Sequence, residues 1–382
     1  MPGLYIHIPF CVKRCIYCDF FSDTCLELKE AYIGALLREM ALRQDEWRGE
    51  TFSTIYFGGG TPSLLQPNEL KKILDGIHRH FSVSSHPEIT LEANPDDLTD
   101  NYISSLTSLP INRISIGIQS LDDRELRFLR RRHTARQAID AVLRCKEAGL
   151  TNISIDLIFG LPGQSMEVWT HTIDEAIDLD VSHISAYNLT YEEGTVIYQK
   201  KQDHDINPVD DDVWAQLYDT LVAKLTRARF VHYEISNFAR RSIDYPSGRI
   251  SLHNASYWDG THYLGLGPSA HSYNGTTRSW NVSSIQAYID AMRDHTKTFY
   301  ETEQLDDHAR YNDFVITRMR TMWGVSLDEL RREFGKTLES YFLQKAECYI
   351  SIKKLKKQGD YVKVLPEYFF ISDAIIRELI VL

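Results

Sequence analysis

Residues 5–20 read YIHIPFCVKRCIYCDF, a strand-like apolar run followed by a loop that carries Cys11, Cys15 and Cys18 in the spacing C-x-x-x-C-x-x-C. This loop offers three thiolates, one fewer than the four that a fully ligated [4Fe–4S] cluster takes. The spacing therefore predicts a cubane cluster with one iron left open to a small molecule. With 6 cysteines in 382 residues, on the order of 0.001 such triplets are expected by chance.

Two other uses of the three cysteines have to be weighed, namely a zinc site and a disulfide with a spare thiol. Structural zinc usually needs a second pair of ligands. The remaining cysteines, Cys25, Cys145 and Cys348, are each solitary in the sequence. The cluster is therefore the favoured interpretation.

A glycine run follows the second strand-like segment. Residues 54–57 read TIYF and residues 58–62 read GGGTP. Glycines at the end of a strand let backbone groups approach a ligand closely. The run is weak evidence alone, and it lacks the G-x-G-x-x-G spacing of a dinucleotide fingerprint.

Polar residues stand in or at the end of three later apolar runs: Glu92 in TLEANP, Gln119 in GIQS and Asp156 in IDL. One such residue is more often a satisfied polar group of the core than part of a site. Several at successive strand ends favour a binding site, because parallel barrels collect their ligand groups at that face.

Composition bounds the function. The chain of 382 residues and 44.2 kDa has a formal net charge of −11 and a pI near 5.7, which argues against nucleic-acid partners and acidic membranes. No apolar run approaches the length of about 20 residues that spans a bilayer. No leader pattern opens the chain, and thiols that must stay reduced predict a cytoplasmic location.

Short apolar runs alternate with helical patterns in the first half of the chain, which is typical of a parallel α/β sheet. The predicted strands are 4–8, 54–58, 88–93, 113–118, 152–158 and 183–189. The predicted helices include 27–46, 67–80, 135–148 and 166–178. Periodicity alone does not distinguish a barrel from an open, doubly wound sheet.

The alternation of strand and helix patterns ends at about residue 200. A helix is predicted over 208–229, and residues 232–282 are expected to be rich in loops because they are dense in Gly, Ser, Asn and aromatic residues. This stretch contains HNASYW at residues 253–258. A loop of that length in a compact domain is typically functional.

Helical patterns dominate from about residue 306, with Ser326 as a predicted N-cap. Short strands are predicted at 360–365 and 368–372. Helices followed by a two-stranded wing predict a small winged-helix-like domain. Without a basic face, this domain is not expected to bind DNA.

Together these motifs resemble those of the radical S-adenosylmethionine (radical SAM) superfamily. Within it, the chain resembles the family of oxygen-independent coproporphyrinogen III oxidases and HemW-type heme chaperones. The likeness implies a partial (β/α)6 TIM-like radical SAM barrel in residues 1–205. It further implies a helix- and loop-rich extension in 206–300 and a small C-terminal α+β winged-helix-like domain in 301–382.

The resemblance also implies a [4Fe–4S] cluster on the three loop cysteines, with its open iron chelated by S-adenosyl-L-methionine (SAM). It assigns these residues to the SAM pocket: Tyr5, Tyr17, Gly59, Gly60, Thr61, Glu92, Gln119, Arg131 and Asp156. The glycine run would hold the methionine amino end. Arg131 stands between Arg130 and Arg132, so its assignment rests on the family motif.

The HNASYW segment matches the H-N-x-x-Y-W motif of HemW-type proteins. On residue chemistry alone, its His and Asn satisfy local backbone groups while the aromatics pack on the barrel. The resemblance instead implies heme contact by His253, Tyr257 and Trp258, because a neutral imidazole ligates iron and aromatic rings offer flat faces to a porphyrin.

Two function classes follow from the resemblance. The first is a heme chaperone that binds heme and passes it to an acceptor hemoprotein, which could be a membrane protein. The second is an enzyme that oxidatively decarboxylates coproporphyrinogen III to protoporphyrinogen IX. Phe20 stands where those enzymes carry a further cysteine, and only four residues precede Tyr5. Both departures favour the chaperone, and they leave productive cleavage of SAM an open question.

Overall fold

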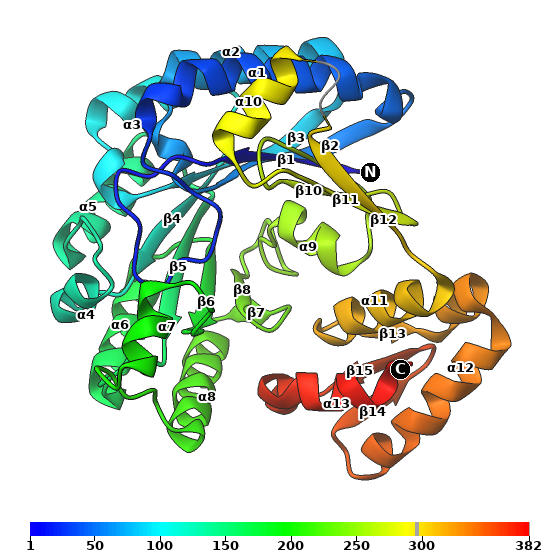
Figure 1. The fold of residues 1–382 in the computed structure, drawn as a ribbon. Coiled ribbons are helices and arrows are strands. Elements are labelled where there is room, and N and C mark those ends of the chain that lie inside the picture. The colour runs from blue at the N-terminus through cyan, green and yellow to red at the C-terminus, as the bar shows by residue number, and fades with distance from the viewer. Residues whose placement is uncertain (295–297, 382) are drawn as a thin grey trace.

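Six parallel strands form the centre of the fold in the computed structural model, which describes residues 1–294 and 298–381 (Figure 1). The strands are β1 (Gly3–Ile8), β2 (Thr51–Gly59), β3 (Ser82–Ala93), β4 (Arg113–Gln119), β5 (Ile153–Phe159) and β6 (His183–Asn188). The helices that follow them are α1 (Lys29–Arg43), α2 (Pro67–His80), α3 (Asp100–Leu106), α4 (Asp123–Phe128), α5 (Ala135–Glu147), α6 (Met166–Asp178) and α7 (Val196–Gln202). The predicted α/β barrel is thus confirmed.

Local sequence explains where these helices begin. Helix α2 starts with Pro67 at its first position, and Gln66 and Glu69 form a capping box around it. Ser165 caps α6 by accepting the N–H of Val168. Both helices have the bounds that the sequence predicts.

Side chains alternate between the two faces of each parallel strand. In β1, Leu4, Ile6 and Ile8 are buried in the core with the helices, whereas Tyr5 and His7 lie on the inner face of the curved sheet. Strand registers carry this alternation through the sheet. The inner face then holds a set of polar and aromatic residues: Thr54, Tyr56, Glu88, Thr90, Glu92, Arg113, Ser115, Ser154, Asp156, His183 and Ser185.

The sheet continues past the barrel at both edges, in the order β12-β11-β10-β9-β1-β2-β3-β4-β5-β6-β8-β7. After α8 (Asp211–Arg227), the added elements are β7 (Phe230–His232), β8 (Asn237–Arg240), α9 (Leu252–Trp258), β9 (Tyr263–Leu266), β10 (His271–Tyr273), β11 (Thr277–Asn281), α10 (Ile285–Arg293) and β12 (Tyr300–Gln304). Strand β9 runs parallel to β1, and the outer strands are antiparallel.

The segment 232–282, predicted to be rich in loops, also contains strands β8 to β11 and helix α9 between its loops. Its strands escape notice because they are short and polar, and their Ser and Asn side chains are buried against partners. Ser272, for example, accepts the N–H of Gly265, and Asn281 donates to the carboxylate of Glu39. The HNASYW residues form helix α9 and not a loop.

The C-terminal part has the predicted winged-helix-like arrangement. It consists of α11 (Asp307–Met319), β13 (Val325–Ser326), α12 (Leu327–Ser351), β14 (Leu355–Gln358), β15 (Tyr361–Val364) and α13 (Ser372–Leu379). Strands β13, β15 and β14 form an antiparallel sheet. Gly335, at φ 79°, divides α12 into two helical parts, and Ser326 caps its start as predicted.

One predicted strand is wrong. Residues 368–372 are not extended, because Pro366–Ile371 forms a 3-10 helix that leads into α13. The wing is instead the hairpin of β14 and β15. Phe369, Ser372, Ile375 and Leu379 are buried at spacings of three and four residues, and an apolar run as short as 368–372 does not reveal that period.

The domain boundaries at 205 and 300 stay predictions. The ranges 206–300 and 301–382 also include residues 295–297 and 382, which lie outside the described residues. Among the helices that the structure describes, none has the length and apolar character needed to cross a bilayer.

Candidate functional site

A cavity of about 400 Å³ lies where the barrel strands end, beneath the cysteine loop. Its lining includes all three loop cysteines and eight of the nine residues predicted for SAM. These eight are Tyr17, Gly59, Gly60, Thr61, Glu92, Gln119, Arg131 and Asp156. Residues far apart in the sequence therefore meet at one cavity.

Backbone and side-chain contacts hold the cysteine loop over the cavity. The N–H of Cys11 donates to the carbonyl of Asp23 at 2.9 Å, and Asp23 donates in turn to the carbonyl of Pro9 at 2.7 Å. Inside the loop, Ile16 is buried in a small cluster with Leu129 and neighbouring apolar residues. The loop is thus anchored on both sides of its cysteines.

The loop thiols are free and differ in their surroundings. Burial, together with the neighbouring Cys15 and Cys11, raises the pKa of Cys18 to about 11. Such a thiol ionises at neutral pH only beside a strong positive charge such as a bound metal. Within residues 1–294 and 298–381, no three Cys, His, Asp or Glu side chains already converge as a metal site.

The glycine run is required by close packing against the first strand. A Cβ on Gly59, whose φ is +109°, would lie 2.6 Å from the ring of His7. A Cβ on Gly60 would lie 2.7 Å from the carbonyl oxygen of Phe10. These glycines therefore allow the chain just before Cys11 to lie directly on the end of β2.

Both carboxylate oxygens of Glu92 accept hydrogen bonds inside the cavity wall. Its Oε1 accepts the hydroxyl of Tyr56 at 2.8 Å, and its Oε2 accepts the N–H of Gly59 at 3.2 Å. Burial raises its pKa to about 7, against these hydrogen bonds and with a further increase from Asp156. Its pKa therefore lies close to neutral pH.

Asp156 and Gln119 lie on neighbouring strands. Burial raises the pKa of Asp156 to about 6, although hydrogen bonds from Ser185 and Ser115 oppose the rise. Gln119 has a φ of 72°, and the register between β4 and β5 shifts between Gly117 and Gln119. This bulge re-aims the Gln119 side chain, a device typical of functional sites.

Arg131 connects the strand ends to the cysteine loop. Its Nη2 donates to Oδ1 of Asn94 at 2.5 Å and to the carbonyl of Gly117 at 2.6 Å. Its Nη1 donates to Sγ of Cys15 at 3.3 Å. The guanidinium is therefore fixed at the cavity, where the family motif places it.

Tyr5 does not line the cavity, unlike the other residues predicted for SAM. Its hydroxyl lies 3.1 Å from Nδ1 of His7, and its ring stacks on Tyr56 with centroids 6.2 Å apart. Tyr5 therefore packs against Tyr56 and does not face the cavity itself.

The residues predicted to contact heme also lie outside the cavity, on α9. His253 is 1% exposed, with Nδ1 2.8 Å from Oγ1 of Thr54 and Nε2 2.9 Å from the hydroxyl of Tyr257. Burial lowers its pKa to about 3, so the ring is neutral. Tyr257 and Trp258 are half-buried. In this arrangement His253 has no free nitrogen for iron.

Sequence reasoning missed several residues that shape the site. Asn94 holds Arg131, Tyr56 holds Glu92, and Ser115 donates to Asp156 at 3.4 Å. For Ser115 the available signal was the alternation of polar and apolar residues along β4, which marks the inner face. Tyr56 lies within an apolar run and Asn94 lies beyond the end of β3, so neither carries this signal.

The sequence matches two protein-family models and several curated proteins. A model described as the radical SAM superfamily matches residues 5–176, and one described as the HemN C-terminal domain matches residues 305–367. The heme chaperone HemW of Mycobacterium tuberculosis (strain H37Rv) is 33% identical over 382 residues, which cover 99% of this chain and 94% of that protein. The chain belongs to the HemW family.

A second HemW relative and a solved structure agree with this assignment. The heme chaperone HemW of Bacillus subtilis is 34% identical over 346 residues, covering 90% of this chain and 89% of that protein. The coproporphyrinogen III oxidase HemN of Escherichia coli superimposes with a TM-score of 0.84 at 21% identity, covering 99% of this chain and 90% of that one. The HemN likeness shows the shared fold. Membership of the radical SAM superfamily implies SAM and a [4Fe–4S] cluster.

Proposed function

We propose that this HemW-family protein binds heme and transfers it to an acceptor protein, and that it carries a SAM-coordinated [4Fe–4S] cluster. The observation that carries the proposal is the position of α9. This helix holds the HNASYW residues, and it packs on β2, the strand whose end lines the cavity. The chain matches proteins named heme chaperone over nearly its whole length.

Cys11, Cys15 and Cys18 would hold the cluster, and the donor set fits, since all three are free thiols that line one cavity. Arg131 places its guanidinium beside the loop, with Nη1 3.3 Å from Sγ of Cys15. When bound, the cluster and SAM supply the electron-transfer chemistry of the superfamily.

The remaining cavity residues would bind and orient SAM. Glu92 and Asp156 offer carboxylates, and Gln119 offers an amide from the bulge at the end of β4. Tyr17 covers the cavity from the loop side and packs against the apolar cluster that anchors the loop. Such a cover would limit the access of water.

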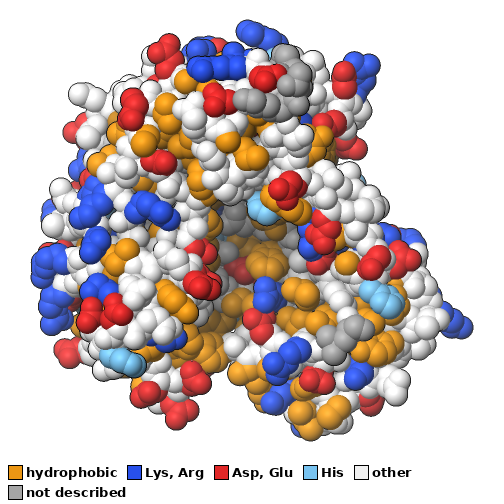
Figure 2. Space-filling view, viewed as in Figure 1, with side chains coloured by type: hydrophobic (Ala, Val, Ile, Leu, Met, Phe, Trp, Pro, Cys, Tyr) orange, Lys and Arg blue, Asp and Glu red, His pale blue; other side chains and the backbone are white. Residues whose placement is uncertain are grey.

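Heme would bind in a hollow of the surface that α9 borders. Figure 2 shows a hollow at the centre of this view, with hydrophobic side chains visible in it, and α9 borders the same region in Figure 1. The half-buried rings of Tyr257 and Trp258 would offer flat faces to a porphyrin. Ligation of iron by His253 would require both of its hydrogen bonds to break.

Oxidative decarboxylation of coproporphyrinogen III is the second candidate, favoured by the close match to the HemN fold. The cavity mouth argues against it. Phe20 lines the cavity and is 63% exposed, so an aromatic ring stands where the enzymes of the family carry a further cysteine. The acceptor would be a hemoprotein and not a nucleic acid, consistent with the net charge of −11.

Three assays on one anaerobically reconstituted preparation test the proposal. Hemin titration should saturate at one hemin per chain, and incubation with coproporphyrinogen III, SAM and a reductant should yield no protoporphyrinogen IX. Transfer should then appear as loss of heme absorption from this protein and its gain by an apo-hemoprotein. Measurable decarboxylation without hemin binding would instead support the enzyme.

A further inference from the structure

His253 lies directly on the aromatic residue that orders the cavity carboxylate. Its ring stacks on the ring of Tyr56 with centroids 4.9 Å apart and planes at 24°. Thr54 and Tyr257 hold its two nitrogens, so the ring is fixed in its own plane. An imidazole with both nitrogens occupied and a neutral charge acts through its shape and its flat face.

Tyr56 connects His253 to the cavity residue Glu92. It is buried, and its hydroxyl donates to Oε1 of Glu92 at 2.8 Å. The other carboxylate oxygen accepts the N–H of Gly59, in the glycine run. Two contacts, one stacking and one hydrogen bond, therefore separate His253 from a group that lines the cavity.

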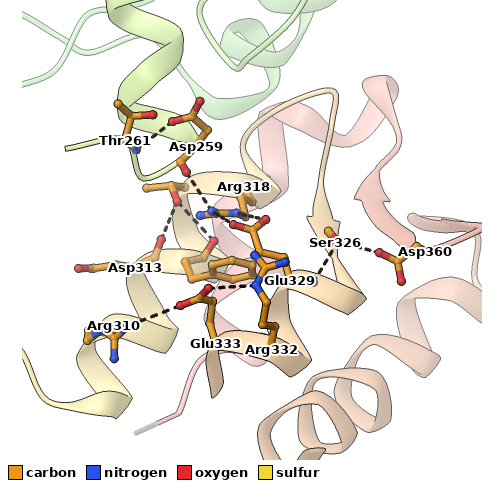
Figure 3. Close-up of polar contacts among 12 residues, drawn as sticks. Asp259, Thr261, Arg310, Asp313, Arg318, Ser326, Glu329, Arg332, Glu333 and Asp360 are labelled. Carbon is orange, nitrogen blue, oxygen red and sulfur yellow. Dashed lines mark hydrogen bonds and ion pairs between the residues drawn. The ribbon is translucent and has the colours of Figure 1, made fainter. Parts of the chain in front are cut away.

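Helix α9 is itself held at both ends, so the His253 ring cannot simply move aside. At its start, the carboxylate of Glu88 accepts the N–H groups of Leu252 and His253 at 3.2 and 3.0 Å. Just beyond its end, the carbonyl of Asp259 accepts Nη2 of Arg318 at 2.9 Å, as Figure 3 shows.

The second anchor belongs to the C-terminal part. Arg318 lies on α11 and pairs with Glu329 of α12 at 2.6 Å (Figure 3). Its guanidinium also covers the ring of Phe314 at 3.7 Å. Helix α9 thus bridges the barrel strands β2 and β3 and the C-terminal helices.

We infer that His253 is a positioning residue, which keeps the Tyr56 hydroxyl on Glu92 and thereby couples α9 to the SAM cavity. The inference rests on the proposed SAM site, but it gives His253 a role other than iron ligand. Coupling of this kind is reciprocal, so a ligand that shifts α9 must change SAM affinity by the same factor that SAM changes the affinity for that ligand.

Two substitutions of His253 test whether its flat ring face matters. His253→Phe keeps a planar ring on Tyr56, His253→Leu fills the space without one, and both lose the same two hydrogen bonds. SAM affinity, measured by calorimetry on cluster-loaded protein, should fall about tenfold in the Leu variant and less than about twofold in the Phe variant. In a Tyr56→Phe background, which lacks the hydroxyl, His253→Leu should cause no further loss.

The control is His232→Leu. This imidazole also stacks on an aromatic ring, Phe238 at 4.2 Å, and is hydrogen-bonded to the carbonyl of Ile235 at 3.1 Å, but Phe238, unlike Tyr56, has no hydroxyl to donate to a cavity carboxylate. Its loss should leave SAM affinity at the parent value. Equal SAM affinities of the Leu and Phe variants of His253 would overturn the inference, as would a full effect of His253→Leu in the Tyr56→Phe background.

The spectrum of bound hemin separates this inference from the proposed function. If His253 only positions Tyr56, hemin bound to His253→Phe should show the spectrum of the parent complex. A lost imidazole signature would make His253 an iron ligand and overturn the inference. Parent protein that binds SAM but no hemin would defeat the heme proposal and leave the coupling standing, whereas parent protein that binds no SAM would defeat the SAM site and the coupling together.

Tyr56→Phe alone covers the case in which neither His253 variant folds. It keeps the ring that stacks on His253 and removes the hydroxyl that donates to Glu92. SAM affinity should fall about tenfold in this variant, and an affinity equal to that of the parent would overturn the inference.

Discussion

Nη1 of Arg131 lies 3.3 Å from Sγ of Cys15, so an arginine of the proposed SAM pocket touches a cysteine of the proposed cluster loop. The same guanidinium is held by Asn94 and by the carbonyl of Gly117, at the ends of β3 and β4. The cysteine loop and the strand ends are therefore linked through Arg131. A substitution in one of them should change the position of side chains in the other.

The first prediction concerns the cluster. Replacing Cys11, Cys15 or Cys18 with Ala should abolish the broad visible absorption of anaerobically reconstituted protein, because these three thiols line one cavity. Cys145→Ala and Cys348→Ala are the controls, since neither residue lines the cavity, and both variants should keep the absorption. Loss of absorption in a control with retention in a loop variant would refute the assignment.

The second prediction concerns SAM binding. Glu92→Gln and Gln119→Ala should weaken SAM about ten- to a hundredfold, because each removes a hydrogen-bonding group worth roughly 1.5–3 kcal/mol when a charged partner is involved. Visible absorption should show the cluster intact, since neither residue is a proposed iron ligand. Unchanged calorimetric affinity in both variants would remove them from the pocket.

The third prediction is a pH dependence of stability. Because burial raises the pKa of Glu92 from its ordinary 4.5 to about 7, the folded protein holds this proton more tightly than the unfolded chain. The resulting stability is fully present below about pH 4.5 and is lost as the pH rises through about 7. Glu92→Gln should therefore reduce the fall in unfolding free energy between about pH 5 and about pH 8 by up to about 3 kcal/mol.

Chemical denaturation of the SAM-free proteins at several pH values measures this difference. Asp156, with a pKa raised to about 6, contributes a slope of the same sign in both proteins. Parallel pH profiles for the parent and Glu92→Gln would mean that Glu92 titrates normally.

The barrel could be predicted because its strands are bounded by strong local signals. Pro67 and Ser165 mark helix starts, and the outer face of β1 is continuously apolar. The added strands could not be predicted, because β10 has only three residues and its buried Ser272 reads as a turn residue. Pairing with distant strands, and not local propensity, decides such segments.

The residues of the candidate site likewise fall into some that the sequence predicts and some that only the fold reveals. Glu92 and Asp156 stand in apolar runs, where a polar residue is conspicuous, and both line the cavity. Tyr56 and Asn94 look ordinary in the sequence, since their roles arise from contacts with Glu92 and Arg131 that only the fold creates. The burial of His253 was likewise not visible, because a helix seven residues long, set among loops, gives little periodic signal.

The fourth prediction concerns the porphyrin face of α9. Trp258→Ala should weaken hemin binding several-fold, because a stacked aromatic pair is worth about 0.5–1.5 kcal/mol beyond its buried area. The type of iron ligand, read from the visible spectrum, should not change. Trp280→Ala serves as the control, because Trp280 is a half-buried ring on β11 that stacks on His271. Equal losses in both variants would indicate a general effect of removing a tryptophan.

The last prediction tests how the glycine run supports the cysteine loop. In Gly60→Ala the new Cβ would lie 2.7 Å from the carbonyl oxygen of Phe10 and 3.0 Å from that of Ile8, both backbone atoms that cannot rotate away. The chain just before Cys11 must then shift, so iron and sulfide per chain after reconstitution should fall, with a loss of about 1–3 kcal/mol in stability. Gly34→Ala is the matched control, because its Cβ on α1 would meet only the end of the Arg38 side chain at 3.9 Å. That variant should hold the parent's iron content and gain about 0.5–1 kcal/mol from its helical position. A Gly60→Ala protein with full iron content and parental stability would show that the cysteine loop does not depend on this close approach.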